Sequence, residues 1–245
     1  METSLHRQLK ALYASGDNPR TEVRLGEYRI DAIQQNTLVE IQHGSLAAIR
    51  GKIGKLLADG HRVLVVKPIV AKKTIIKQDS PGGRVVSRRL SPKRCGVLDL
   101  FHELIYFTQV FPHKKLVLEV PLVEVEELRY PGHGKRRRWR RDDHTVEDQR
   151  LVCVNEVHRF ATLRDLWQLM PPSLPQPFHT GHIAEGLGVA RWIAQRMAYC
   201  LVKTGATKEV GKEGNARLYL GQVADLPKRK RSPGRKKKPA AILAS

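Results

Sequence analysis

Two short runs of alternating apolar and polar residues, 28–33 and 37–42, are separated only by the polar turn Gln34-Gln35-Asn36. A period of two is typical of a β-strand with one buried face, so the runs predict an antiparallel hairpin. Asp31 and Glu40 occupy polar positions in these runs. Two carboxylates held close together repel each other unless a cation lies between them. This hairpin is therefore the strongest candidate for chemistry in the chain.

The segments around the hairpin predict a definite order of elements. Residues 4–14 have the apolar spacing of an amphipathic helix, and residues 21–25 predict a strand. After the hairpin, Ser45 is a plausible N-cap for a helix through residue 57, and residues 61–69 predict a fully buried strand. The predicted order is α-β-β-β-α-β, with the two acids on the second and third strands.

This order, together with Asp31 and the tripeptide Glu40-Ile41-Gln42, resembles the PD-(D/E)xK nuclease superfamily, which includes many restriction enzymes and Holliday-junction resolvases. The resemblance covers residues 1–70 and implies an α/β restriction-endonuclease-like core in which Asp31 and Glu40 hold Mg²⁺. Glu22, on the first strand, is a candidate third metal ligand. Gln42 stands where the family usually has lysine, although some of its nucleases carry Gln there. The whole chain also looks like members of an uncharacterised bacterial family of this layout.

The resemblance implies Mg²⁺-assisted hydrolysis of phosphodiester bonds, with Gln42 orienting the attacking water. A cation normally offsets the charge that develops on the phosphate, and Lys52 on the following helix is the candidate for the displaced lysine. The competing interpretation is that Asp31 and Glu40 are ordinary solvated strand residues or a decayed site. For Lys52 the favoured interpretation is a solvated residue of an exposed helix face.

The charge of the chain is uneven. Its formal net charge is +20 and its pI is about 10.2. The segment 135–141 holds six basic residues and the segment 228–238 holds eight, so 30 basic residues remain against 24 acidic ones. Such basic segments bind phosphate backbones without sequence preference. The expected partner is nucleic acid, with DNA favoured over RNA, although phosphate contacts do not distinguish the two polymers.

The middle of the chain predicts an extension of the nuclease-like sheet. Residues 72–77 and 84–87 flank a Pro-Gly-Gly turn and predict a hairpin, followed by a basic loop over 88–94. Residues 97–110 predict an amphipathic helix. Strand patterns follow at 116–129 and 150–157.

The C-terminal third predicts three helices followed by a β-ribbon. A short helix over 162–170 is followed by a helix with Thr180 as N-cap, a turn at Gly188, and a helix over 190–203 that Gly205 ends. Residues 207–210 and 216–220 predict the ribbon. This order resembles a winged helix-turn-helix, and the resemblance implies that the third helix enters the major groove. The expected DNA contacts are Arg191, Gln195, Arg196, Lys212 and Arg217. Winged helices also serve as protein-interaction modules, and Trp192 would suit that role.

Other features bound the setting of the protein. Cys95, Cys153 and Cys200 form no Cys-x-x-Cys pair, so buried thiols in a reducing cytoplasm are expected. His179 and His182 lack a zinc spacing and are expected to be structural. No apolar run suggests secretion or membrane insertion. The sequence does not determine the oligomeric state, and a homodimer is compatible with it.

These expectations combine into one layout. Residues 1–160 are expected to form a nuclease-like domain with its extension, 161–222 a winged helix domain, and 223–245 a disordered basic tail. The expected function is that of a Mg²⁺-dependent DNA endonuclease. The alternative is a catalytically inactive protein that keeps the nuclease fold for DNA binding or regulation.

Overall fold

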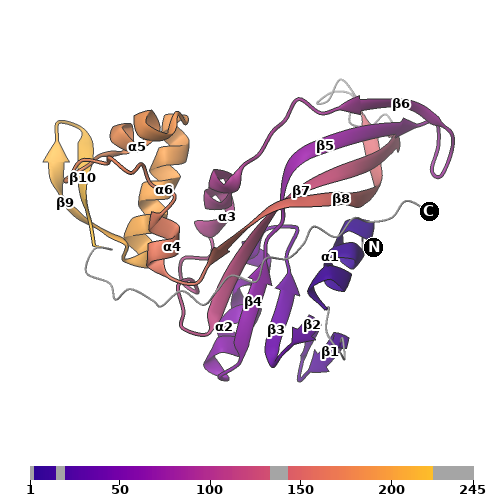
Figure 1. The fold of residues 1–245 in the computed structure, drawn as a ribbon, viewed down its shortest axis with the longest axis horizontal. Coiled ribbons are helices and arrows are strands. Elements are labelled where there is room, and N and C mark those ends of the chain that lie inside the picture. Colours follow the sequence, from indigo (N-terminus) through magenta and orange to yellow (C-terminus); the bar gives the residue numbers. More distant parts are fainter. Residues whose placement is uncertain (1–2, 15–19, 133–142, 223–245) are drawn as a thin grey trace. The chain divides into compact units, whose positions relative to one another are not determined.

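The computed structural model describes residues 3–14, 20–132 and 143–222, and these residues form a mixed α/β fold (Figure 1). The expectations about the basic segment 135–141 and the basic tail 223–245 lie outside the described residues. None of the helices in the described part of the chain has the length and the apolar character needed to cross a membrane.

The elements follow the chain in this order: α1 (Ser4–Tyr13), β1 (Arg20–Leu25), β2 (Tyr28–Gln34), β3 (Thr37–Ile41), η1 (Leu46–Ile49), α2 (Arg50–Ala58), β4 (Arg62–Val66), β5 (Ile69–Gln78), β6 (Val85–Leu90), η2 (Val97–Leu100), α3 (Phe101–Leu104), β7 (Leu116–Pro131), β8 (His144–Phe160), α4 (Leu163–Trp167), α5 (Thr180–Leu187), α6 (Arg191–Thr204), β9 (Thr207–Glu213) and β10 (Ala216–Gly221). The expected α-β-β-β-α-β order is therefore present at the N-terminal end. The large sheet has the order β1-β2-β3-β4-β7-β5-β6, and β8 pairs with β7.

The contacts within the chain divide it into two compact units. Unit 1 consists of residues 1–43, 65–97 and 119–158, and unit 2 consists of 44–64, 98–118 and the residues from 159 onward. The chain thus passes from one unit to the other five times. This division does not follow the expected boundary at 160, because two internal segments group with the C-terminal residues.

The three N-terminal strands of unit 1 form an antiparallel meander, and helix α1 packs against β2 and β3. Leu5, Leu9 and Tyr13 recur every four residues on α1 and are buried, which explains how this short helix is held. Between β2 and β3, Gln35 and Asn36 both adopt positive φ angles, of 45° and 63°. Two successive left-handed residues give the turn that best matches the twist of a two-residue hairpin.

The second half of the unit 1 sheet differs in detail from the sequence pattern. The predicted strand over 61–69 is wrong as one element, because β4 ends at Val66 and β5 begins at Ile69. Pro68 lies at the break, and proline cannot donate to a strand ladder. The predicted loop over 88–94 is also wrong at its start, since β6 continues to Leu90 and pairs antiparallel with β5.

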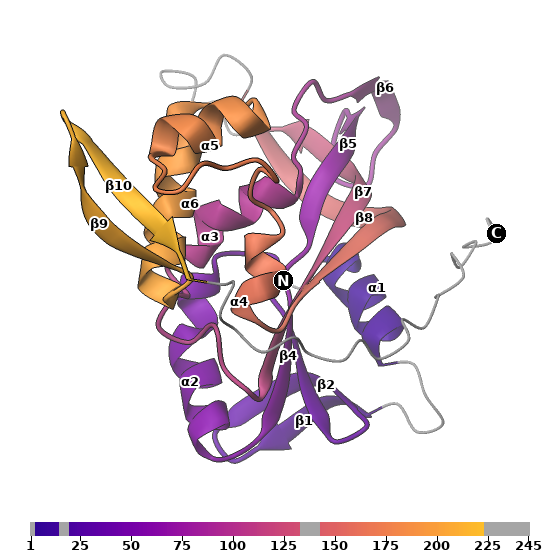
Figure 2. The ribbon, with the colours of Figure 1, turned by 60° about the vertical axis from the view of Figure 1, so that its left-hand side comes forward.

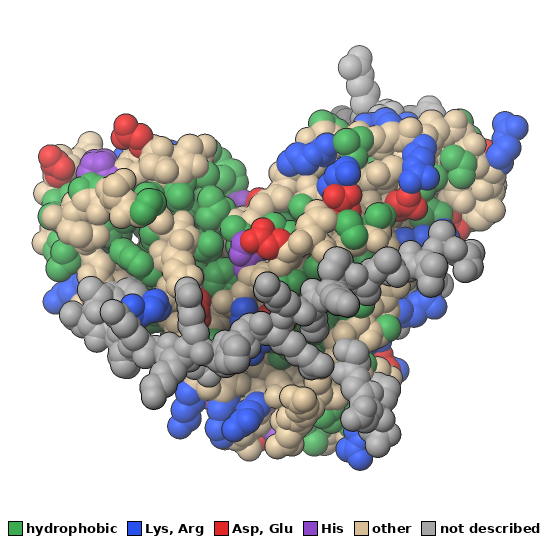
Figure 3. Space-filling view, in the orientation of Figure 1, with side chains coloured by type: hydrophobic (Ala, Val, Ile, Leu, Met, Phe, Trp, Pro, Cys, Tyr) green, Lys and Arg blue, Asp and Glu red, His purple; other side chains and the backbone are tan. Residues whose placement is uncertain are grey.

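Several Lys and Arg side chains and a few acidic ones are exposed in the region of β5 and β6 (Figure 3), and the acidic partners of the β5 and β6 cations belong to β7. Lys72 binds Glu124 at 2.9 Å, and Arg88 binds Glu126. β5 and β7 run parallel with Lys72 opposite Glu124, so this register explains the first pair. The strands therefore carry partly neutralised charge rather than a surface of one sign.

In unit 2, the predicted helix over 97–110 is shorter than expected. A 3₁₀ turn over Val97–Leu100 leads into α3, which ends at Leu104. Beyond it, Phe107 donates to Leu104 and Val110 donates to Phe107, which are bonds of tight turns. The apolar side chains at helical spacing are still buried, so the sequence period reports the buried face and not the type of turn. These buried residues are Leu100, Phe101, Leu104, Phe107 and Phe111.

The C-terminal elements of unit 2 occur in the expected order, with two packed helices followed by a ribbon (Figure 2). The predicted N-cap Thr180 is wrong by one residue. Nδ1 of His179 accepts from the backbone N–H of Gly181 at 3.0 Å, and His179 and His182 stack with ring centroids 3.7 Å apart. The expected structural role of this His pair is thus confirmed. Gly205 ends α6 with φ of 81°, a conformation that favours glycine.

Candidate functional site

Three acidic residues lie in one row across the first three strands of unit 1. The β1–β2 register pairs Thr21 with Ala32 and Val23 with Ile30, so Glu22 and Asp31 lie between these two pairs. The β2–β3 register ends at the pair Ala32–Val39, so Asp31 and Glu40 are the next residues outward. Residues opposite each other in an antiparallel pair project from the same face of the sheet. We call Glu22, Asp31 and Glu40 the acidic row.

Asp31 is held in a defined position by two donors. The backbone N–H of Ile41 donates to Asp31 Oδ2 at 2.8 Å, and His6 Nε2 lies 3.4 Å from Oδ1. Burial raises the pKa of this carboxyl, but the His6 contact and the Ile41 bond outweigh it and hold the pKa below its usual value. Asp31 is therefore ionised at neutral pH. The side chain keeps 18% of its surface exposed, whereas Glu40 is buried at 5%.

Glu22 lies at a distorted point of β1, with φ of 57°. It forms ion pairs with Lys10 and Arg29. The hydrogen bond from Lys10 lowers the pKa of Glu22, so this carboxyl is also ionised at neutral pH. The charge of Glu22 is thus already neutralised by two cations within the fold.

Helix α1 places two basic side chains over the acidic row. His6 and Lys10 are four residues apart and so share one side of the helix. His6 contacts Asp31, and Lys10 pairs with Glu22 while its charge also lowers the pKa of Asp31. Lys10 is only 7% exposed. The sequence carried a signal for the placement of these two side chains, because His6 and Lys10 directly follow the apolar positions Leu5 and Leu9.

The segment after β3 brings a second buried lysine into unit 1. The backbone N–H of Gln42 donates to Val66 at 2.9 Å, which fixes Gln42 beside the end of β4. Lys67, which follows Val66, is 6% exposed and donates from Nζ to the carbonyl of His43 at 2.9 Å. Burial lowers the pKa of His43, and the charges of Lys67 and His6 lower it further. His43 is therefore neutral at physiological pH.

A further buried carboxylate lies on β7. Glu127 is 2% exposed and accepts from Lys73 Nζ at 2.8 Å, from Gln149 Nε2 at 2.7 Å and from Arg129 Nε at 2.6 Å. Burial raises its pKa, but these three hydrogen bonds prevail and lower it. Charged groups buried in a fold need such partners. Glu127 with its three donors stabilises this part of the sheet, and the sequence pattern did not single it out.

The acidic row supplies the hard oxygen ligands that Mg²⁺ prefers. In the stretches that the structure describes, no group of three or more His, Cys, Asp or Glu side chains is arranged to hold a metal ion. Asp31 and Glu40 could still act as metal ligands, because Mg²⁺ usually keeps several waters and needs only one or two carboxylates beside a substrate phosphate. Glu22, predicted as a third ligand, binds Lys10 and Arg29 instead.

Of the predicted catalytic residues, Asp31, Glu40 and Gln42 all belong to unit 1 and to one hairpin with its immediate continuation. Lys52 lies on α2, is half-buried and belongs to unit 2. The structure offers Lys10 and Lys67 as buried lysines in the unit that contains the acids.

The predicted DNA-contacting residues lie on α6 and on the β9–β10 ribbon. Arg191 and Gln195 are exposed on α6, and Lys212 and Arg217 are exposed on the ribbon, where Arg217 pairs with Glu209 at 3.2 Å. Arg196 differs from the others because it bonds His102 of α3 and its guanidinium lies over the Trp192 ring, 5.2 Å from the centroid. Arg196 is therefore engaged within unit 2.

The fold and the acidic row define a mixed α/β protein with a large sheet and acidic residues on the strands that lie beside its N-terminal helix. The chain belongs to the family described as "Domain of unknown function (DUF8091)", whose model matches residues 3–161. The match includes the whole acidic row and ends before α4. No curated protein and no solved structure matches the chain.

Proposed function

We propose that the protein is a divalent-metal-dependent nuclease that acts on DNA. The acidic row carries this proposal, because the matching strand positions of Glu22, Asp31 and Glu40 would bring their carboxylates to one face of the sheet. Neighbouring carboxylates repel each other unless cations offset their charge, and Lys10 and Arg29 do this for Glu22. The resemblance to the PD-(D/E)xK nucleases supports the same assignment, as does the net charge of +20.

Asp31 and Glu40 would hold the metal ion, which we propose is Mg²⁺. When bound, such an ion polarises a phosphoryl oxygen and lowers the pKa of a water ligand. The Ile41 N–H and His6 fix the orientation of Asp31, and both favour its ionised form. Gln42, anchored by its backbone to Val66, would orient the attacking water through its side-chain amide. Lys10 would supply positive charge beside the row in place of the usual lysine.

The C-terminal elements would guide this activity as a winged helix. The order helix, helix, turn, helix and ribbon over α4 to β10 supports that assignment. Arg191, Lys212 and Arg217 are the exposed basic residues that would contact duplex DNA. The basic segments 135–141 and 228–238 would add contacts to phosphates without sequence preference.

The test is cleavage of plasmid and oligonucleotide DNA by the full chain with Mg²⁺, Mn²⁺ or Ca²⁺, with RNA as a parallel substrate. Asp31→Asn preserves the size of the side chain and an acceptor for Ile41, but it removes a charged metal ligand. We expect cleavage to fall by at least about a hundredfold, since such ions supply several kcal/mol to the transition state. Asp79→Asn, in an exposed turn, is the matched control and should cleave normally.

Two lysine variants separate the candidates for the cationic residue. Lys10→Met should reduce kcat with little change in DNA affinity, as expected of a group that acts on the transition state. Lys52→Met should leave kcat unchanged. The opposite result would return the role to Lys52, and two unchanged variants would show that neither lysine assists.

A second candidate is an inactive nuclease fold that binds DNA. It is favoured by Gln42 in the lysine position and by the donors that already occupy Asp31. Wild-type protein that binds DNA but shows no cleavage with any of the three metals would establish this candidate and overturn the nuclease proposal.

A further inference from the structure

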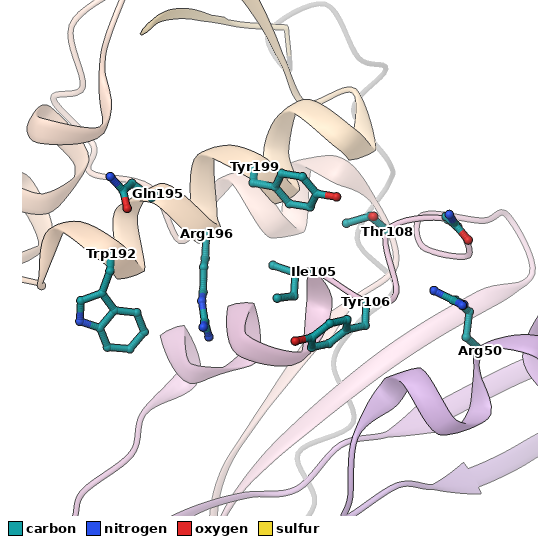
Figure 4. A pocket seen from close by; sticks show the side chains of 9 residues that line it. Arg50, Ile105, Tyr106, Thr108, Trp192, Gln195, Arg196 and Tyr199 are labelled. Carbon is teal, nitrogen blue, oxygen red and sulfur yellow. The ribbon is translucent and has the colours of Figure 1, made fainter. Parts of the chain in front are cut away.

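A groove of about 740 Å³ within unit 2 contains an unusual concentration of exposed aromatic side chains (Figure 4). It lies between α6 and the turns that follow α3, with Arg50 at one end. Trp192, Tyr106 and Tyr199 are 49%, 48% and 48% exposed. Single exposed aromatic side chains are ordinary, but three in one groove are typical of a surface that binds a ligand or a partner.

The groove side of α6 is a regular stripe. Trp192, Gln195, Arg196 and Tyr199 have the spacing i, i+3, i+4 and i+7, which places them on one side of the helix. The opposite side carries Ala194, Met197, Ala198 and Leu201, all buried at 2% exposure or less. The helix thus anchors itself through one side and presents the aromatic and polar stripe to the groove.

The main aromatic platform is fixed in advance. The His102 ring packs on Trp192 with centroids 4.9 Å apart and an angle of 31° between the planes. Arg196 lies over the same indole and also bonds His102. An indole held by these two side chains does not need to be ordered when a ligand stacks on its exposed part, which reduces the entropic cost of binding.

The charge and hydrogen-bonding groups of the groove define its ligand. The lining includes Arg50 and Arg196 but neither Asp nor Glu. Gln109, Gln195 and Thr108 add groups that can donate and accept hydrogen bonds. Flat aromatic platforms beside guanidinium groups and amides suit a chain of bases joined by phosphates. A duplex keeps its bases stacked inside, so only an unpaired strand can use the platforms.

We propose that the groove between α3 and α6 binds a single-stranded segment of nucleic acid. Bases stack on Trp192, Tyr106 and Tyr199, and Arg50 contacts the phosphates, while Arg196 holds the Trp192 indole in place. This assignment gives Gln195 and Arg196 a role different from reading base edges in a major groove. It goes beyond the proposed hydrolysis and does not depend on it.

The test measures the affinity of the full chain for a dye-labelled 12-nucleotide oligo-dT and for a duplex of the same length by fluorescence anisotropy. EDTA is present, so binding is independent of any metal-dependent cleavage. Any binding by the basic segments acts on both probes, and the ratio of the two affinities therefore isolates the groove. Trp192→Ala should weaken oligo-dT binding by about fivefold or more, the lower bound for one stacked base, and leave the duplex unchanged.

Matched variants separate stacking from folding. Trp192→Phe keeps an aromatic platform and should retain most of the single-strand affinity. Leu220→Ala removes an exposed apolar side chain of the ribbon and should change neither affinity. Arg50→Gln should reduce the salt dependence of oligo-dT binding by about 0.7 for each lost phosphate contact, whereas Arg62→Gln, at another exposed arginine of unit 2, should not.

Two results would overturn the proposal. One is a Trp192→Ala variant, folded by circular dichroism, whose affinities for both probes are unchanged or fall in parallel. The other is an Arg50→Gln variant that binds oligo-dT in the same way as the wild type. Either result would leave the aromatic stripe as a surface for a protein partner.

Discussion

At the scale of single residues, Glu127 shows how this fold keeps a charge in its interior. The carboxylate is almost fully buried, yet three donors hold it in the ionised form. Its neighbour Glu126 pairs with Arg88, whose side chain is 64% exposed. The two glutamates are adjacent in the sequence but differ in what their charge contributes to stability. Exposed ion pairs contribute little, whereas removing one partner of a buried pair leaves an uncompensated charge in the interior and is strongly destabilising.

We expect Glu127→Gln to lower the free energy of unfolding by about 3 kcal/mol, because Lys73 and Arg129 lose the charge that they surround. Glu126→Gln should cost at most about 1 kcal/mol. Urea denaturation of both variants beside the wild type measures the difference. Equal losses would show that burial of the carboxylate does not determine its contribution.

The contribution of Glu127 to stability should also depend on pH in a definite direction. The folded pKa of Glu127 lies below its usual value of 4.5, so the unfolded chain binds the proton more tightly. Its contribution to stability is present above about pH 4.5 and is lost as the pH falls through the lower folded pKa. The difference in stability between wild type and Glu127→Gln should therefore shrink on acidification.

At the scale of elements, the hydrophobic period located most helices and strands, and local chemistry decided their ends. The strand over 116–129 and the helix over 190–203 were predicted to within a few residues of β7 and α6. The ends of β4 and α3 were not, because Pro68 and tight turns intervene. Asp31 and Glu40 could be placed on one hairpin from the alternation alone. The roles of His6 and Lys10 could not, since they depend on where α1 packs.

The start of α5 offers a direct test at this scale. His179→Ala removes the acceptor for Gly181 and His182 and should reduce the free energy of unfolding by about 1 kcal/mol, the usual cost of losing an N-cap. Thr180→Ala, one residue further on, should cost no more than a few tenths of a kcal/mol. Thermal unfolding followed by circular dichroism distinguishes them. A larger loss from Thr180→Ala would restore the threonine as the cap.

At the scale of the whole molecule, the excess positive charge resides in two short segments, while the remaining chain is nearly balanced. Deleting residues 228–238 should weaken binding to every DNA sequence alike. The slope of log K against log salt should fall by about 0.9 for each lost phosphate contact. Deleting Pro239–Ser245, which contains no charged side chain, is the control and should leave the slope unchanged. A slope that survives the first deletion would place the phosphate contacts elsewhere.

The repeated passage of the chain between the two units has a consequence for how the protein is made. Unit 1 needs residues up to 158 before its sheet can close, and unit 2 needs the residues that follow them. Neither unit can be completed on the ribosome while the first half of the chain emerges. Contacts so distant in sequence are slow to form. The nascent β1–β2–β3 meander is therefore made before β7 and β8, and apolar surface that stays exposed in this interval is prone to aggregation.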